Sequence, residues 1–152
     1  MLRITRQADY GIVLLTQFAR SNARVFSARE LADKTLIPLP MVGKILKKLL
    51  QEGLLTSQRG THGGYRLAEQ PQDITVGRII AALDGPVAIT DCTSTAPVEC
   101  GIEEACPVSG AWRRINAEVI HALDRVSLAE MTCPVGNPVA AFTGTRGRSG
   151  RE

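Results

Sequence analysis

Apolar residues recur at helical spacing in three segments near the start of the chain. Residues 5–20 carry apolar side chains three and four positions apart, which predicts an amphipathic helix. A second helix is predicted over Ala28–Lys34, because Ser27 and Glu30 form a capping-box pattern at its start. A third helix is predicted over Pro40–Gln51, where proline suits the first helical position and apolar residues gather on one side.

A short hairpin is predicted after the third helix. Leu54–Gln58 and Tyr65–Leu67 have the pattern of strands and enclose a glycine-rich turn, and a fourth helix follows over Val76–Leu83. Three helices followed by a hairpin is the order of a winged helix-turn-helix. We therefore predict a mainly α fold with a small β-hairpin wing, in which residues 1–68 form a DNA-binding domain and residues 69–85 hold a connecting helix.

The longest helical pattern covers Val108–Leu128 and carries a narrow apolar stripe. Either this stripe packs on its own domain, or it pairs with a second copy in a coiled-coil-like seam. We favour a homodimer, because the N-terminal module is too small to cover the stripe. Residues 107–131 are thus a predicted dimerisation helix, and residues 132–152, which lack periodicity, a predicted disordered tail. The stripe begins at Val108, and its predicted interface residues are Trp112, Ile115, Val119, Leu123 and Val126.

Basic residues concentrate in the first part of the chain. Residues 1–66 hold 11 Lys and Arg against 4 Asp and Glu, whereas residues 67–152 hold 7 against 11. This asymmetry predicts a polyanionic partner for the first part, although a solvated surface is the plainer explanation for any single lysine. No apolar run approaches the ~20 residues that span a bilayer. We therefore expect a cytoplasmic protein that does not associate with membranes.

The predicted third helix is suited to the major groove of double-stranded DNA, with its N-terminal residues toward the base edges. Pro40 and Met41 then form its leading edge, and Lys44 points toward a guanine edge. Lys47 and Lys48 are predicted phosphate contacts, which position the protein without reading sequence. The predicted DNA-binding set also includes residues near the N-terminus, at the cap of the second helix and in the wing: Arg3, Arg6, Ser27, Arg59, Gly60, His62, Gly63, Gly64 and Tyr65.

Three cysteines lie close together in the segment 86–106. Cys92, Cys100 and Cys106 are separated by seven and five residues, which is wider than the two to four residues typical of a zinc knuckle. Thiolates at varied spacing suit an iron–sulfur cluster, and three of them leave one ligand position open. A structural zinc site and a metal-free thiol redox sensor remain alternatives. Candidates for the fourth ligand are Asp9, Asp91, Glu99, Glu103, Glu104, His121 and Cys133.

Catalytic patterns are absent from the sequence. It has only two histidines, no Ser/His/Asp or Cys/His pairing, and no phosphate-binding glycine loop after a strand. We therefore expect neither an enzyme nor a small-molecule substrate.

Four sequence segments together resemble the Rrf2 family of winged-helix regulators. The resemblance covers about residues 1–130, and its most specific parts are the R-G-x-x-G-G-Y wing and the three-cysteine loop. The Cys100-Gly-Ile-x-x-x-Cys106 spacing is most similar to the subgroup that regulates the Suf cluster-assembly operon. The four segments are Arg3–Tyr10, Ile37–Leu50, Arg59–Ala68 with Asp73–Thr75, and the cysteine loop.

This resemblance implies a homodimer with one iron–sulfur cluster per subunit, of the 2Fe-2S or 4Fe-4S type, bound by the three cysteines. Cluster loading would set affinity for two-fold symmetric operators of cluster-biogenesis genes. The chain departs from the family's assembly regulator at Ser109, where that protein has its fourth ligand, a histidine. Asp9 matches the aspartate that completes the site from the other subunit in the nitric-oxide sensor. Gly43 replaces a glutamate that tunes the choice of DNA sites.

Overall fold

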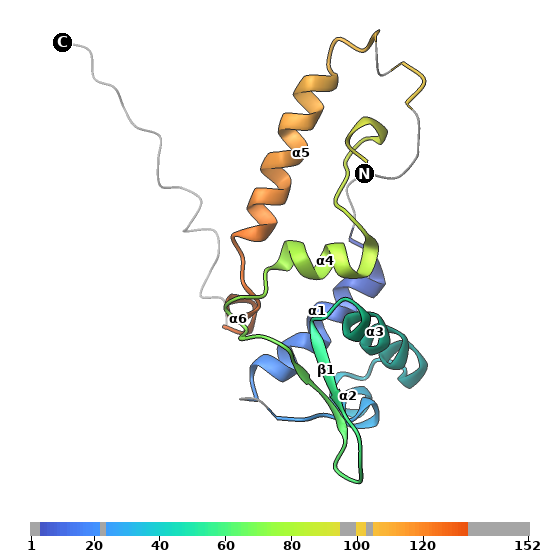
Figure 1. Ribbon diagram of the computed structural model, residues 1–152, viewed down its shortest axis with the longest axis vertical. Coiled ribbons are helices and arrows are strands. Elements are labelled where there is room, and N and C mark those ends of the chain that lie inside the picture. The colour runs from blue at the N-terminus through green and yellow to red at the C-terminus, as the bar shows by residue number, and fades with distance from the viewer. Residues whose placement is uncertain (1–3, 22–23, 95–99, 103–104, 134–152) are drawn as a thin grey trace, which may run out of the picture.

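The computed structural model describes residues 4–21, 24–94, 100–102 and 105–133 (Figure 1). Arg3, Glu99, Glu103, Glu104 and the predicted tail from residue 134 onward lie outside the described residues. The elements follow one another as α1 (Arg6–Ala19), α2 (Ala28–Thr35), α3 (Leu39–Gln51), β1 (Leu55–Gln58), β2 (Gly64–Leu67), α4 (Val76–Asp84), the 3-10 turn η1 (Asp91–Thr93), α5 (Ser109–Asp124) and α6 (Leu128–Thr132). This is the predicted mainly α fold with a two-stranded antiparallel wing.

Side-chain caps start α1, α2 and α4, whereas α3 has no side-chain cap and carries a proline in its first turn. The Thr5 and Thr75 hydroxyls accept from backbone N–H groups of α1 and α4 at 3.2 Å. Ser27 accepts from the Glu30 N–H at 3.2 Å, as the capping-box pattern predicts. The reciprocal half of that box is absent, because the Glu30 carboxylate instead pairs with Arg24 at 2.6 Å.

The hydrophobic core lies between α1, α3, α4 and the hairpin. Leu14, Leu15, Ile45 and Leu49 are fully buried in it. The hairpin joins this core through β1, which pairs with β2 from Leu55↔Leu67 to Gln58↔Gly64. A further bridge between Phe26 and Tyr65 ties the wing to the segment before α2, so the wing is fixed to the helical domain at its base.

The single helix predicted over Val108–Leu128 is wrong at its C-terminal end. Helix α5 ends at Asp124, and a new helix, α6, begins after Ser127. Ser127 and Glu130 form a reciprocal capping box. The Ser127 N–H and hydroxyl both donate to the Glu130 carboxylate, which lowers the pKa of that carboxyl. Leu128 is fully buried in the core and its N–H donates to the Ile74 carbonyl at 2.8 Å. Burial of this leucine turns the chain away from the α5 axis.

Helix α5 extends away from the domain, and the wing and the first part of the cysteine loop lie at opposite ends of the molecule (Figure 1). The base of α5 is fixed at α4: the Thr75 hydroxyl donates to the Asp124 carboxylate at 3.0 Å. Gly77 lies at this contact, and a Cβ there would displace the Asp124 carboxylate from the position in which it accepts from Thr75. Within one chain, the cysteine loop is therefore joined to the DNA-binding domain by the two helices that flank it, α4 and α5.

We expect Gly43→Ala to raise the free energy of unfolding by about 0.5–1 kcal/mol. A Cβ at Gly43 would meet no atom within 4 Å, so alanine adds helix propensity to α3 without a clash. Urea denaturation measures the change. Gly77→Ala is the matched control and should lower stability, since its Cβ would displace Asp124. A destabilised Gly43→Ala protein would contradict the open space beside α3.

Candidate DNA-binding surface and cysteine loop

Helix α3 presents one apolar face to the core and one basic face to solvent. Val42, Ile45 and Leu46 are buried, whereas Lys44 and Lys47 are exposed. Pro40 is also exposed at the start of the helix, and Met41 is half-buried. These positions leave Pro40, Lys44 and Lys47 accessible to DNA, as their predicted roles require; the contacts themselves stay predictions.

Lys48 has a partner within the protein that sequence reasoning missed. Its Nζ donates to the Leu83 carbonyl at 2.7 Å, and Gln7 Nε2 donates to the same oxygen at 3.1 Å. A cation at the C-terminal end of α4 is favourable because it faces the negative end of the helix dipole. Lys48 therefore connects α3 to the end of α4; the phosphate contact predicted for it stays a prediction.

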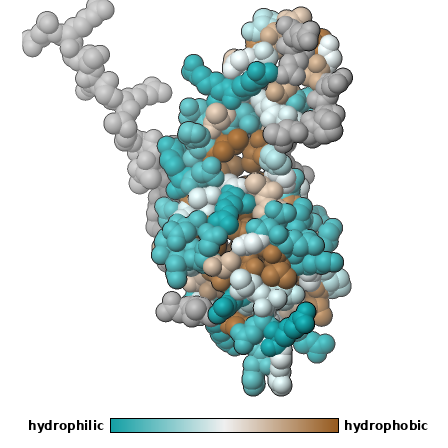
Figure 2. All heavy atoms as spheres, in the orientation of Figure 1, coloured by the Kyte–Doolittle hydropathy of each residue, from teal (hydrophilic) through white to brown (hydrophobic). Residues whose placement is uncertain are grey.

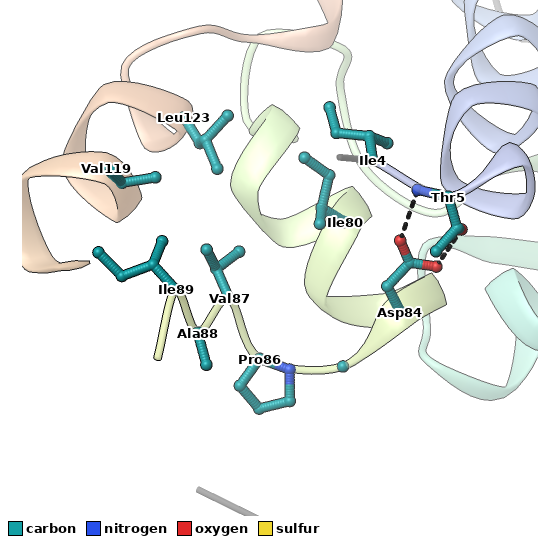
Figure 3. A pocket seen from close by; sticks show the side chains of 11 residues that line it. Ile4, Thr5, Ile80, Asp84, Pro86, Val87, Ala88, Ile89, Val119 and Leu123 are labelled. Carbon is teal, nitrogen blue, oxygen red and sulfur yellow. Dashed lines mark hydrogen bonds between the residues drawn. The ribbon is translucent and has the colours of Figure 1, made fainter. Parts of the chain in front are cut away.

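The same end of α4 also holds the start of α1. The Asp84 carboxylate accepts from the Thr5 hydroxyl at 2.6 Å and from the Thr5 N–H at 3.3 Å (Figure 3). We call Leu83 and Asp84, with their partners Thr5, Gln7 and Lys48, the α4 junction. It links α1 and α3 immediately before the chain enters the cysteine loop at residue 86.

The predicted wing residues divide into an exposed tip and a half-buried base. Arg59, Gly60 and His62 are exposed at the tip. Gly63, Gly64 and Tyr65 are half-buried at the base, where the Tyr65 N–H donates to the Phe26 carbonyl at 2.8 Å and a Cβ at Gly64 would strike that same carbonyl. The tip thus offers side chains to a ligand, while the base positions it. Arg6 at the start of α1 and Ser27 at the cap of α2 are also exposed.

The three loop cysteines are half-buried free thiols. Cys92 lies in η1, where its Sγ is 3.2 Å from the Thr90 hydroxyl. The Cys106 carbonyl accepts from the Ser109 hydroxyl at 3.2 Å, so Ser109, the first residue of α5, helps to fix the end of the loop. Cys133, also free, is exposed after α6 and is not part of this loop.

A buried asparagine on α5 fixes the start of the cysteine loop. Asn116 is only 7% exposed, accepts from the Ile89 N–H at 3.1 Å and donates to the Val87 carbonyl at 3.1 Å. Both functional groups of its amide are therefore satisfied by the loop backbone. This role is invisible in the sequence, where Asn116 is a polar residue in the middle of a helical pattern.

An open, mainly apolar pocket of about 380 Å³ lies beside the segment that Asn116 holds, between the loop, α4 and α5. Val87, Ile89, Val119 and Leu123 line one side of it, and Ile4 and Thr5 the other (Figure 3). Figure 2 shows apolar surface gathered in the same region between α5 and the rest of the molecule.

The metal-ligating side chains that the structure describes do not form a metal-binding group. Among residues 4–21, 24–94, 100–102 and 105–133, no group of three His, Cys, Asp or Glu is placed to hold a metal ion. Asp9 is exposed on α1 and His121 is exposed on α5. The three loop cysteines are nevertheless suitable ligands for a soft metal or an iron–sulfur cluster, because all three are half-buried and form no disulfide.

A winged helix with a basic, exposed recognition-helix face is the architecture of a DNA-binding transcription regulator. The Rrf2 family model, described as an iron-dependent transcriptional regulator, matches residues 4–134. The chain belongs to the Rrf2 family. It is therefore a transcription regulator and not an enzyme. In the part of the chain described here, no helix is long and apolar enough to cross a bilayer.

Relatives and solved structures agree with this assignment. An Rrf2-like regulator of Rhodobacter capsulatus is 27% identical over 90% of this chain and 96% of its own length. IscR of Photobacterium profundum is 28% identical over 86% of this chain and 75% of its own. The structure of CymR, the global cysteine regulator of B. subtilis, is similar with a TM-score of 0.68 and 27% identity, covering 87% of this chain and 97% of CymR.

We expect substitutions of the exposed Lys44 and Lys47 to change DNA binding, and substitution of Lys48 to change the stability of the protein. On a duplex of arbitrary sequence, Lys44→Ala and Lys47→Ala should each reduce the slope of log affinity against log salt by about 1, because each variant neutralises one phosphate fewer. Both should change stability by less than about 0.5 kcal/mol, because they are exposed. Lys48→Met should lower the free energy of unfolding by about 1 kcal/mol, since the Leu83 carbonyl loses a donor.

Salt titration of duplex binding and urea denaturation measure these effects. Equal stability of Lys48→Met and wild type would show that the α4 junction does not depend on Lys48.

Proposed function

We propose that the chain is a homodimeric regulator whose DNA affinity depends on an iron–sulfur cluster, and that it controls genes of cluster biogenesis. The cluster would be held by Cys92, Cys100 and Cys106. One observation carries the proposal: the three free, half-buried thiols lie in a loop that begins at the α4 junction and is clamped to α5. Membership of a family described as iron-dependent and similarity to IscR proteins support the same function.

The choice of cluster over zinc rests on ligand chemistry. Gaps of seven and five residues are wider than those of zinc knuckles, whereas cysteines bind iron–sulfur clusters at varied spacing. Thiolates are soft ligands that suit both metals, so the proposal of iron over zinc is supported by the cysteine spacing and by family membership. Ser109 has no side-chain nitrogen that could serve as a ligand, and its hydroxyl donates a hydrogen bond to the Cys106 carbonyl.

The fourth ligand is proposed to be Asp9 from the partner subunit. Within one chain, Asp9 is an exposed residue of α1 that borders an open surface pocket with Ile4 and Ile12. It is not grouped with the described cysteines of its own chain. A carboxylate oxygen is a weaker ligand for iron than a thiolate, so a cluster completed in this way would be labile, as a sensor requires.

The dimer is proposed to form through α5. Trp112 and Ile115 are 39% and 46% exposed on a helix that extends beyond its domain, and Val108 is 49% exposed. Pairing with the same face of a second copy would bury this stripe. Val119 and Leu123 are already partly covered by their own subunit, and Val126 lies beyond the end of α5. The interface would therefore centre on the first half of α5.

The proposed coupling runs through residues of this chain. When bound, the cluster would supply bonds that fix the cysteine loop. Asn116 holds Val87 and Ile89 against α5, and Gly85, with φ of 91°, lets the chain turn directly from α4 into this loop. Lys48 connects the end of α4 to α3. A change in the loop would thus alter the orientation of α3, and a dimer must place its two recognition helices about 34–36 Å apart to match successive major grooves.

Anaerobically purified protein is expected to be coloured, with iron and acid-labile sulfide, and to absorb visible light through thiolate-to-iron charge transfer. Cys92→Ala should lose the colour and the iron. Cys133→Ala is the matched control and should keep both, because Cys133 lies outside the loop. Absorption spectra and assays of iron and sulfide make the test.

Two results would contradict the cluster. Colourless protein containing zinc would favour a structural metal site. Colourless, metal-free protein whose loop thiols pair reversibly on oxidation would favour a thiol redox sensor.

A further inference from the structure

Leu36 stands in the turn between α2 and α3 in a conformation that leucine disfavours. Its φ is 57°, in the left-handed region, and it is the one non-glycine residue with positive φ in the described part of the chain. Glycine or asparagine usually occupies this position at the end of a helix, because a Cβ is strained there. The Leu36 side chain is also 90% exposed, so burial in this chain does not offset the strain. Backbone strain of this kind tends to mark functional positions.

The residues that follow Leu36 extend this exposed apolar surface to the start of α3. Pro38 and Pro40 are exposed, and Leu39 is 42% exposed. We call Leu36, Pro38, Leu39 and Pro40 the apolar edge.

The apolar edge offers few hydrogen-bond donors. Both prolines lack an N–H, and the Met41 N–H already donates to the Pro38 carbonyl at 2.9 Å. The edge is therefore poorly suited to binding phosphate through the helix N-terminus or to reading bases by hydrogen bonds. What it presents to a partner is aliphatic carbon.

The position of the edge favours DNA over a protein as the partner. It lies at the N-terminal end of the recognition helix, the part that faces base edges in helix-turn-helix proteins. The exposed cations Lys44 and Lys47 follow it on α3, which matches a polyanion. The one apolar group that base pairs expose in the major groove is the C5-methyl of thymine.

We propose that the apolar edge, above all Leu36, contacts thymine methyl groups and so selects A·T pairs at fixed positions of each operator half-site. This inference rests on the proposed DNA-binding function and adds a source of sequence preference to it.

The test begins with selection of duplexes from a library with a randomised centre, using full-length protein prepared anaerobically. In the selected operator, each thymine is then replaced singly by deoxyuridine, which removes only the methyl group. Wild-type affinity should fall about fourfold at each contacted position, the effect of losing one buried methyl. Replacement of thymines outside the footprint should have no effect.

Leu36→Asn tests the protein side of the contact, and asparagine tolerates the left-handed conformation, so the fold is retained. This variant should bind the thymine operator more weakly and lose its sensitivity to deoxyuridine. Met131→Asn is a matched control, since Met131 is an exposed apolar residue of α6 at 41% exposure, and it should keep wild-type sensitivity.

Each outcome has a distinct meaning. An operator bound equally with thymine and deoxyuridine at every position by the wild type, or a Leu36→Asn variant as sensitive to deoxyuridine as the wild type, would overturn this inference alone. Failure to enrich any duplex would overturn DNA recognition itself, and the inference with it.

Discussion

The C-terminal end of α4 is the point on which the arrangement of this protein depends. The Leu83 carbonyl accepts from Lys48 of α3 and Gln7 of α1, and the Asp84 carboxylate accepts from Thr5. Leu83 and Asp84 therefore contact both the recognition helix α3 and the first helix α1, directly before the cysteine loop begins. Because a helix end leaves carbonyl groups without partners, capping them with groups from other helices stabilises α4 and fixes its neighbours together. We propose that this junction carries the state of the loop to the DNA-binding surface.

The helices and the wing were predictable because their signals are local. Caps, glycine-rich turns and helical periodicity all lie within a few residues of the elements they specify. The end of α5 was missed although its signal, the Ser127–Glu130 capping box, is present in the sequence, because Val126 continues the apolar spacing past the end of the helix. The third-helix lysines illustrate a different limit. Lys44 and Lys48 look equivalent in the sequence, and only the fold gives Lys48 a partner 35 positions away.

The candidate sensor site could be predicted only as a set of residue types. Three clustered cysteines indicate thiolate chemistry, but their ligand geometry depends on loop conformation and on a second subunit. Asn116 escaped prediction because its partners, Val87 and Ile89, lie 29 and 27 positions away. The exposed stripe around Trp112 and Ile115 also depends on a second subunit, because only the partner of a proposed dimer would cover it.

Operator affinity with and without the cluster is the decisive measurement for the proposed coupling between the cysteine loop and α3. Affinity for a selected operator duplex would be measured anaerobically on loaded protein and on the same protein after chelation, at one salt concentration. We expect a difference of roughly 5- to 150-fold, the usual range of allosteric coupling. Lys48→Met, which weakens the α4 junction, should show a smaller difference. Equal affinities of loaded and stripped wild-type protein would contradict the coupling.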